Sequence, residues 1–127
     1  MSYKILVVDD EESILKLVQS RLTAGGYQVF TASNGEEGIA KAKTLRPDVI
    51  VLDVLMPVMD GPQMAEALKD YPETKDIPVI FLTCLVKDNE VKRDHLIGGH
   101  IFLAKPFKAE ELQKMLKSVL EKKGKHE

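Results

Sequence analysis

The sequence predicts an α/β protein, built as a single domain in which strands and helices alternate. Short apolar runs recur along nearly the whole chain, separated by longer segments with the spacing of amphipathic helices. The clearest runs are almost continuous in Val, Ile, Leu and Phe, which is typical of strands covered by helices on both faces. The length, 127 residues, fits one domain. Five β-then-α units of this kind favour an open, mostly parallel sheet.

Five strands are expected, each a short apolar run. They are KILVV (4–8), QVFTA (28–32), DVIVL (48–52), PVIFL (78–82) and IFLA (101–104). Because crossovers between parallel strands are right-handed, few windings remain, and a flavodoxin-like, doubly wound (βα)5 sheet with the order 2-1-3-4-5 is the leading candidate. Ligands of such sheets bind beyond the carboxyl ends of the strands, where the winding direction reverses.

The first and last helices are predicted from apolar stripes at helical spacing. The stripe of the first helix consists of Ile14, Leu17, Val18 and Leu22. The stripe of the last helix consists of Leu112, Met115, Leu116, Val119 and Leu120. Each stripe is expected to pack against the sheet.

The ends of the other helices are predicted from capping and stop signals. Gly25-Gly26 should stop the first helix, and Ser33 followed by Glu36 has the spacing of a capping box at the start of the second. Pro62 lies near the start of the third helix, where a missing N–H costs little. A fourth helix is expected over DNEVKRDHLIGG (88–99), ending at its Gly-Gly pair, although its apolar residues are sparse.

Composition excludes several classes of protein. The formal charge of −2 gives no electrostatic basis for general nucleic-acid binding, and a single cysteine, Cys84, excludes an internal disulfide framework or a cysteine-based zinc cluster. No apolar stretch approaches the roughly 18 residues of a membrane span. The N-terminus becomes acidic too early for a signal peptide, so a cytoplasmic location is expected. Residues 1–122 are expected to form the domain, and residues 123–127 a disordered tail or the start of a linker.

Residues with chemical potential follow four strands that are consecutive neighbours in the order 2-1-3-4-5. They are Asp9 and Asp10 after the first strand, Asp53 after the third, Thr83 after the fourth, and Lys105-Pro106 after the fifth. Each alone has an ordinary explanation, since Asp caps turns, Thr favours strands and Lys-Pro often marks a turn. Because the carboxyl ends of parallel strands meet at one edge, their joint placement predicts one shallow pocket.

The chemistry of this set favours phosphoryl transfer. Three crowded carboxylates repel one another unless a cation joins them, and oxygen ligands without cysteine or histidine suit Mg²⁺ or Mn²⁺. Lys105 offers a point charge for an anion beside the metal, and Thr83 offers a hydroxyl donor. A spare carboxylate in such a site is a nucleophile for phosphorus, so Asp53 is expected to form an aspartyl phosphate.

On these segments the sequence resembles the receiver domain of two-component response regulators. The matching stretches are ILVVDDEE (5–12), VIVLDVLMPVMDG (49–61), PVIFLT (78–83) and FLAKPF (102–107), in the order and at the spacing of that family. The resemblance implies that Asp53 is the phosphoacceptor and Asp10 a direct Mg²⁺ ligand. It also implies that Asp9 acts mainly through a metal-bound water and that the backbone carbonyl of Leu55 completes the protein ligands.

The resemblance implies further roles near the end of the sheet. Lys105 would contact the phosphoryl group, Thr83 would swing toward it after transfer, and Phe102 would be the switch aromatic. The Lys105–Pro106 peptide bond would be cis. The output would be a changed surface over the fourth helix, the fifth strand and the fifth helix.

The resemblance also implies partners. The phosphoryl donor would be a sensor histidine kinase, a phosphotransfer protein or a small phosphodonor, and the receiver would be no enzyme beyond its own phosphorylation and dephosphorylation. The output would pass to an unidentified protein target or a covalently linked output domain. This chain itself would contact neither nucleic acid nor membrane.

Three other interpretations compete with this one. An aspartate-nucleophile phosphatase of the haloacid-dehalogenase type needs a second Asp two residues after the nucleophile, where Leu55 stands. A flavin- or nucleotide-binding domain needs a Gly- or Ser/Thr-rich turn after the first strand, and DDEES would repel phosphate there. A receiver-like interaction module that works without phosphorylation would not need the complete set of acceptor, acidic pair, Thr and Lys, and it remains the alternative.

Overall fold

The computed structural model describes residues 3–54, 61–83, 96–97, 100–104 and 107–124, with the backbone alone for residues 83, 96–97, 100 and 122–124. Its centre is one sheet whose strands follow the order β2-β1-β3-β4-β6-β5. The strands are β1 (Lys4–Val8), β2 (Gln28–Ala32), β3 (Val49–Asp53), β4 (Val79–Thr83), β5 (Leu96–Ile97) and β6 (His100–Ala104). The first five in this spatial order are parallel, which confirms the predicted order 2-1-3-4-5 of a flavodoxin-like sheet.

The sixth strand, β5, corrects one prediction. Leu96 and Ile97 pair antiparallel with Ile101 and His100 of β6, so a helix over 88–99 is wrong at these two residues. The pairing of Ile97 with His100 leaves two residues of the sequence between them, and Gly-Gly between two short strands is itself a hairpin signal. At Leu96 and Ile97 this hairpin signal agrees with the structure, and the sparse helical spacing of the apolar residues does not. The rest of the predicted fourth helix lies outside the described residues.

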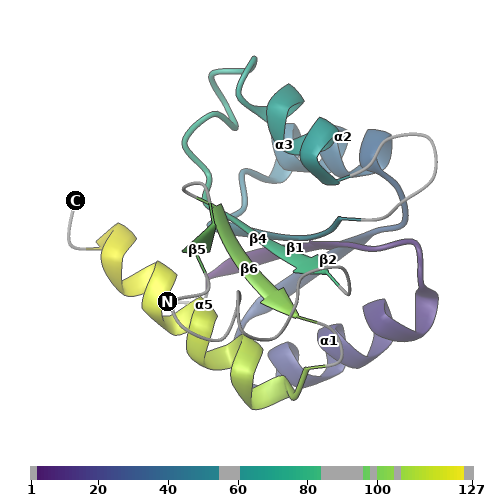
Figure 1. Ribbon diagram of the computed structural model, residues 1–127, viewed down its shortest axis with the longest axis vertical. Coiled ribbons are helices and arrows are strands. Elements are labelled where there is room, and N and C mark those ends of the chain that lie inside the picture. The colour runs from purple at the N-terminus through teal and green to yellow at the C-terminus, as the bar shows by residue number, and fades with distance from the viewer. Residues whose placement is uncertain (1–2, 55–60, 84–95, 98–99, 105–106, 125–127) are drawn as a thin grey trace.

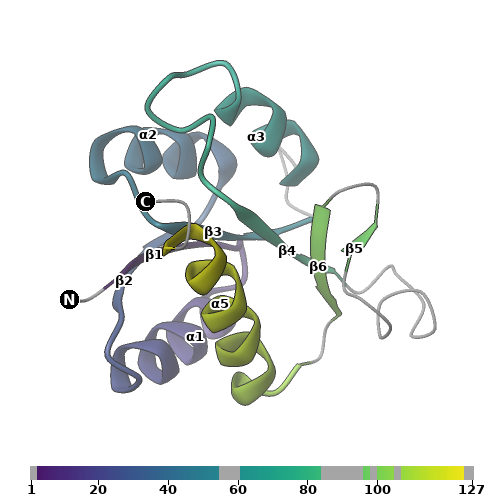
Figure 2. The same ribbon diagram turned by 90° about the vertical axis from the view of Figure 1, so that its left-hand side faces the viewer.

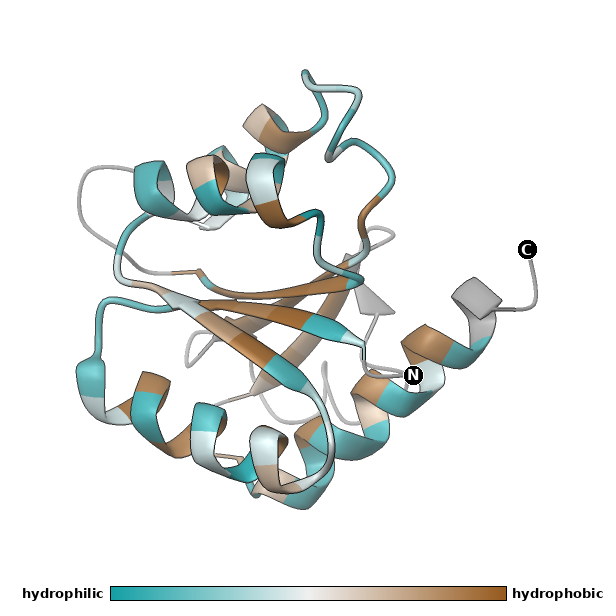
Figure 3. Ribbon diagram, turned by 180° about the vertical axis from the view of Figure 1, so that it is seen from behind, coloured by the Kyte–Doolittle hydropathy of each residue, from teal (hydrophilic) through white to brown (hydrophobic). Residues whose placement is uncertain are grey.

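Two pairs of helices cover the two faces of the sheet (Figures 1 and 2). On one face lie α1 (Glu12–Ala24) and α5 (Ala109–Gly124), and on the other lie α2 (Gly35–Leu45) and α3 (Gly61–Leu68). Within β1, Ile5 and Val7 belong to the first core, and Leu6 and Val8 belong to the second, as the two-residue period of a strand requires. The apolar strands lie between helices whose outward sides are hydrophilic (Figure 3).

The apolar stripe of α5 is confirmed, and that of α1 needs a correction. Leu112, Leu116, Val119 and Leu120 are buried, and Met115 packs at their margin. In α1 the buried residues are Leu15, Val18 and Leu22, with Ile14 partly buried beside them. Leu17 is 47% exposed, because the stripe that faces the sheet runs through Leu15 instead.

The predicted end of α1 and the predicted place of Pro62 near the start of α3 are confirmed. Helix α1 ends before Gly25, and Gly26 has a φ of 97°, which suits glycine. Pro62 is the second residue of α3.

The start of α2 is capped one residue later than the predicted Ser33–Glu36 pair. The side chain of Asn34 accepts a hydrogen bond from the backbone N–H of Glu37 at 2.8 Å. The Glu37 carboxylate in turn accepts from the backbone N–H of Ser33 at 2.6 Å. The pair that closes this turn is therefore Asn34 and Glu37, at the same three-residue spacing.

Strand β2 lies at one edge of the sheet, and side chains from two helices reach its outer side. The backbone of β2 pairs inward with β1, with Gln28 donating to the carbonyl of Tyr3 and Ala32 accepting from Asp9. The carbonyl oxygen of Val29 accepts from Nε2 of Gln19 on α1, at 3.5 Å. The carbonyl oxygen of Thr31 accepts from Nζ of Lys41 on α2. In the part of the chain that the structure describes, no helix is long and apolar enough to cross a bilayer.

Candidate functional site

An acidic cluster lies at the carboxyl edge of the sheet, where β1 and β3 end side by side. Val8 is in register with Leu52, so Asp9 and Asp53 each follow paired residues. Asp9 has no exposed surface and Asp53 only 5%, whereas Asp10 is exposed. One carboxylate oxygen from each of these three residues lies within 4.8 Å of the others. The structure therefore brings together the three acidic residues that the sequence predicts for the metal site.

The backbone orients Asp9 from two sides. Its N–H donates to the carbonyl oxygen of Ala32 at 3.1 Å, and its Oδ1 accepts from the backbone N–H of Glu11 at 2.9 Å. One carboxylate oxygen is thus occupied within the turn that leads to α1. The sequence does not predict this contact of Glu11, since it depends on the backbone path of the turn.

The donor set of this cluster fits a small divalent cation. Mg²⁺ binds oxygen at about 2.1 Å, so two ligands on opposite sides of the ion lie about 4.2 Å apart. The three carboxylate oxygens lie within 4.8 Å of one another, which is close to that span. Two buried carboxylates also repel each other strongly in a low-dielectric setting, which a cation between them relieves.

The remaining predicted site residues are described in part. Thr83 is the last residue of β4 and is in register with Ala104, the last residue of β6, so its backbone lies at the same edge as Asp53. Lys105 with Pro106 follows Ala104 directly and lies outside the described residues, as does Leu55. The predicted cis bond, the lysine contact and the carbonyl ligand therefore stay predictions.

The predicted switch residue, Phe102, stacks on a second aromatic ring. Phe81 of β4 is in register with Phe102 of β6, and their ring centroids are 5.2 Å apart with an interplanar angle of 26°. Phe81 is buried and Phe102 is partly buried, on the face of the sheet covered by α2 and α3. Phe81 was not singled out from the sequence. The matched positions of the two rings in PVIFLT and IFLA were the available signal.

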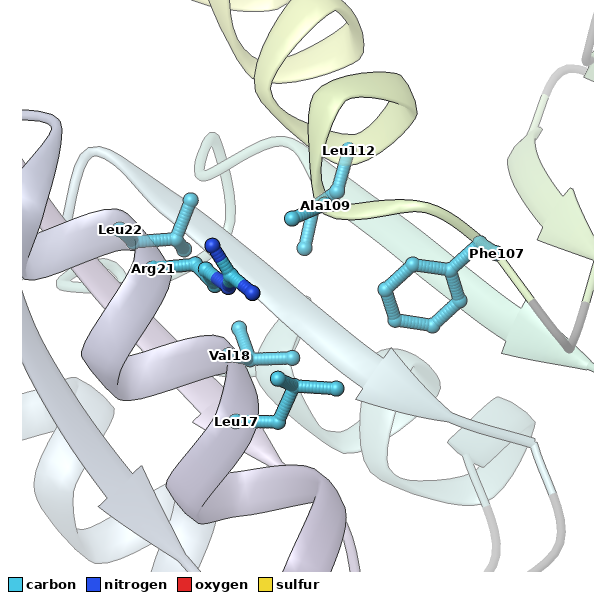
Figure 4. A pocket seen from close by; sticks show the side chains of 7 residues that line it. All are labelled: Leu17, Val18, Arg21, Leu22, Phe107, Ala109 and Leu112. Atoms are coloured by element: carbon cyan, nitrogen blue, oxygen red, sulfur yellow. The ribbon is translucent and has the colours of Figure 1, made fainter.

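A shallow apolar groove lies between α1 and the start of α5 (Figure 4). Leu17 and Val18 line it from α1, and Phe107 and Ala109 line it from the chain that enters α5. The exposed side chain of Leu17 therefore lies beside other apolar side chains rather than alone in solvent. The groove is separate from the acidic cluster, with which it shares no lining residue.

Comparisons with known proteins agree with this arrangement. The family described as the response regulator receiver domain matches residues 5–117. The chain is 40% identical over 120 residues to the alkaline phosphatase synthesis transcriptional regulatory protein PhoP of Bacillus subtilis, a match that covers 94% of this chain and 49% of that protein. It is 43% identical over 106 residues to the response regulator PleD of Caulobacter vibrioides, covering 84% of this chain and 23% of that protein.

Solved structures give the same result. The chemotaxis response regulator CheY4 of Vibrio cholerae superposes with a TM-score of 0.82 at 38% identity, covering 94% of this chain and all of that chain. A receiver domain of a signal transduction histidine kinase from Syntrophus aciditrophicus gives 0.80 at 36% identity, covering 94% and 91%. The chain spans about half the length of the first curated relatives that it matches. By its sequence, its sheet order and its acidic cluster, the chain belongs to the receiver domains of two-component response regulators, a family of phosphoacceptor signalling domains rather than a classical enzyme family.

Proposed function

We propose that this receiver domain accepts a phosphoryl group on the carboxylate of Asp53 in a reaction that depends on Mg²⁺, with Mn²⁺ as a substitute. The observation that carries the proposal is the convergence of three carboxylates from two neighbouring strand ends, two of them buried. Like charges this close repel each other, and a divalent cation bound between them would offset that repulsion.

Each residue has a defined part in the proposed transfer. A carboxylate oxygen of Asp53 forms a bond to phosphorus while the bond to the leaving group breaks, and the electron pair leaves with the imidazole nitrogen of a phosphohistidine or with acetate. Asp10, Asp9 through a water, and the carbonyl of Leu55 would hold the ion. The ion, when bound, offsets the negative charge that gathers on the phosphoryl oxygens. Lys105 would contribute a second positive charge there.

The proposed output is a shift between two states of the surface around β6 and α5. Thr83 would move toward the new phosphoryl group and Phe102 would change its position. The conformation of the surface around β6 would then depend on whether Asp53 is phosphorylated. An almost complete switch, from 1:99 to 99:1, needs about 5.5 kcal/mol of difference between the two states. Phosphorylation and its reversal would be the only reactions, and both would be autocatalysed.

The proposed partners follow from the family and from the lengths of its members. A sensor histidine kinase or phosphotransfer protein would donate the phosphoryl group, and acetyl phosphate would serve as a small donor. PhoP of Bacillus subtilis is about twice as long as the match, so an output domain joined after the receiver at residues 1–122, through a linker from 123–127, is one route for the signal. A separate protein target is the other, and CheY4 is covered completely by this chain. Because the donors depend on cellular phosphate metabolism, we place the reaction in the cytoplasm.

The acceptor is tested by intact mass spectrometry after incubation with acetyl phosphate and Mg²⁺. Wild type is expected to gain one phosphoryl group, and Asp53→Asn none, because the amide is no nucleophile for phosphorus. Asp70→Asn makes the same change at an exposed carboxylate outside the cluster and should gain the group as wild type does. Chelation of Mg²⁺ should abolish the gain.

The alternative is a receiver-like module that works without phosphorylation. It would be favoured if folded wild type gained no phosphate with Mg²⁺ present, from acetyl phosphate and from a phosphorylated histidine kinase alike. Phosphate on a residue other than Asp53 would also contradict the assignment of the acceptor.

A further inference from the structure

Gly61, the first residue of α3, lies against the backbone of Asp53. A Cβ atom on Gly61 would lie 2.5 Å from the carbonyl oxygen of Asp53 and 2.9 Å from the Cα of Val54. The backbone N–H of Gly61 donates a hydrogen bond to the carbonyl oxygen of Val54 at 3.0 Å. The chain therefore leaves β3 after Asp53 and returns at Gly61 to touch the peptide unit of Asp53 itself. A hydrogen atom is the largest side chain that this contact accommodates.

Both sides of this contact are held in the fold. Met64, Ala65 and Leu68 bury α3 in the core on its face of the sheet. The pairing of β3 with β1 ends at Leu52, whereas its pairing with β4 continues to Asp53. An added Cβ atom at position 61 is therefore expected to press on the carbonyl group of Asp53 and on Val54, because the buried side chains of α3 keep the helix from moving away freely.

The size of that displacement matters for the site. Cβ atoms essentially never approach other heavy atoms closer than 3.0 Å, so the backbone would have to move by at least half an ångström. Catalytic groups need placement within about 0.5 Å, and an error of 1 Å can cost about a hundredfold in rate. We propose that Gly61 is a positioning residue, whose missing side chain lets α3 hold Asp53 in the cluster with Asp9 and Asp10. This inference rests on the proposed function, in which Asp53 is the acceptor.

A second glycine on the same face provides a matched control. A Cβ atom on Gly38 of α2 would lie 2.8 Å from Cε of Met64 and 3.0 Å from Cγ2 of Val8. Both contacts are to side chains, and the closer one is to the flexible end of Met64, which can turn away. Gly38→Ala thus adds the same methyl group at a tight packing position without pressing on the Asp53 backbone.

The experiment compares wild type, Gly61→Ala and Gly38→Ala at a temperature well below the melting point of each. Circular dichroism establishes that each is folded, and intact mass gives the rate of phosphorylation by acetyl phosphate at saturating Mg²⁺. Gly61→Ala is expected to be slower than wild type by about tenfold or more, and Gly38→Ala to stay within about twofold. Mn²⁺ affinity, measured by electron paramagnetic resonance without a phosphodonor, should fall in Gly61→Ala and not in Gly38→Ala.

Two outcomes would overturn the inference: a folded Gly61→Ala with the rate and Mn²⁺ affinity of wild type, or an equal loss in both variants. If Gly61→Ala is unfolded in buffer, the comparison is made in trimethylamine N-oxide, which favours the compact state. If wild type itself gains no phosphate, the proposed function fails. The Mn²⁺ affinities of the three proteins then still decide whether Gly61 positions the cluster.

Discussion

Asp9 shows how a fully buried carboxylate is accommodated at the end of a strand. Burial of an ionised carboxylate is costly unless hydrogen bonds or an opposite charge offset it. The N–H of Glu11 supplies one hydrogen bond, and the neighbouring acidic residues add repulsion rather than relief. In the proposed state, a cation that joins Asp9, Asp10 and Asp53 would add a favourable charge interaction to this hydrogen bond.

The carboxylate of Glu37 gives a residue-scale prediction about pH. Its pKa is lowered, mainly because it accepts the backbone hydrogen bond of Ser33 and also because Lys41 lies nearby. A carboxyl whose folded pKa is lower than its unfolded pKa stabilises the protein above the unfolded pKa. That contribution is lost as the pH falls through the folded pKa. Glu37→Gln should therefore lower stability at neutral pH by at most about 1 kcal/mol, and the difference should vanish in acid.

Urea denaturation of wild type and Glu37→Gln between neutral pH and the acid range measures this difference. Glu36→Gln is the control, because it makes the same change at the neighbouring, exposed side chain, and its stability should stay close to that of wild type. A gap between wild type and Glu37→Gln that widened toward acid would contradict the assignment.

The start of α2 also shows how far single residues can be read from sequence. The three-residue spacing of an acceptor and a glutamate was recognisable, and it predicted a capped helix start there. Two such pairs overlap, Ser33 with Glu36 and Asn34 with Glu37, and the sequence does not choose between them. Which pair caps the helix depends on the residue at which the backbone enters the helix. The packing of α2 against β1 and α3 sets that residue.

At the scale of elements, the buried strands were predictable to within one residue, because both faces are covered and the runs are continuously apolar. The one-residue shift of β3 matters, since it makes Asp53 the last residue of the strand rather than the first residue after it. The strand β5 was not predicted, because two residues are too few to show the alternation of apolar and polar residues that is typical of a strand. In α1 one of the four predicted stripe residues was wrong: Leu17 is exposed and Leu15 is buried, because Leu17 lies three residues after Ile14 and Leu15 lies three residues before Val18, so both fit a helical spacing.

The two leucines of α1 give an element-scale prediction. Leu15 is 8% exposed in the core, and Leu17 is 47% exposed beside the groove at α5. Leu15→Ala should lower the free energy of unfolding by about 2–5 kcal/mol, because it leaves a cavity against the sheet. Leu17→Ala should lower it by less than about 1 kcal/mol. Urea denaturation midpoints of the two variants measure this difference in stability. Equal losses in the free energy of unfolding would show that the contacts of Leu17 in the groove stabilise the protein as much as those of Leu15 in the core.

At the scale of the whole molecule, the site is a consequence of topology. The order of the strands alone predicted that Asp9, Asp10, Asp53 and Thr83 would meet at one edge, and the structure brings the three acidic residues together there. What the sequence did not reveal are contacts set by loop paths, such as Gly61 against the carbonyl of Asp53. These depend on where a chain returns after leaving a strand, which no local period encodes.

Metal binding should be visible in the stability of the entire fold. A ligand at a hundred times its dissociation constant stabilises the protein that binds it by about 2.7 kcal/mol. Mg²⁺ is therefore expected to raise the melting temperature of wild type by several degrees, and that of Asp53→Asn by less. Without Mg²⁺ the order should reverse, with Asp53→Asn more stable than wild type, because one of three repelling charges is gone.

Calorimetry of wild type and Asp53→Asn with and without Mg²⁺ measures both orders of melting temperature. NaCl at equal ionic strength is the control. A wild type that melts at the same temperature in both conditions would mean that the acidic cluster does not bind Mg²⁺ in the folded state.

The donors on the outer side of β2 have a consequence for how copies of this protein meet. An uncovered edge strand is a template on which a neighbouring chain can add its own strand, and such growth leads to aggregates. Here the amide of Gln19 and the ammonium of Lys41 already engage the carbonyls of Val29 and Thr31 that an incoming chain would need. At the opposite margin, β5 pairs with β6 in the same manner as an added strand would. Crowded copies thus find fewer open acceptors at the β2 border, which disfavours the addition of a strand from another copy there.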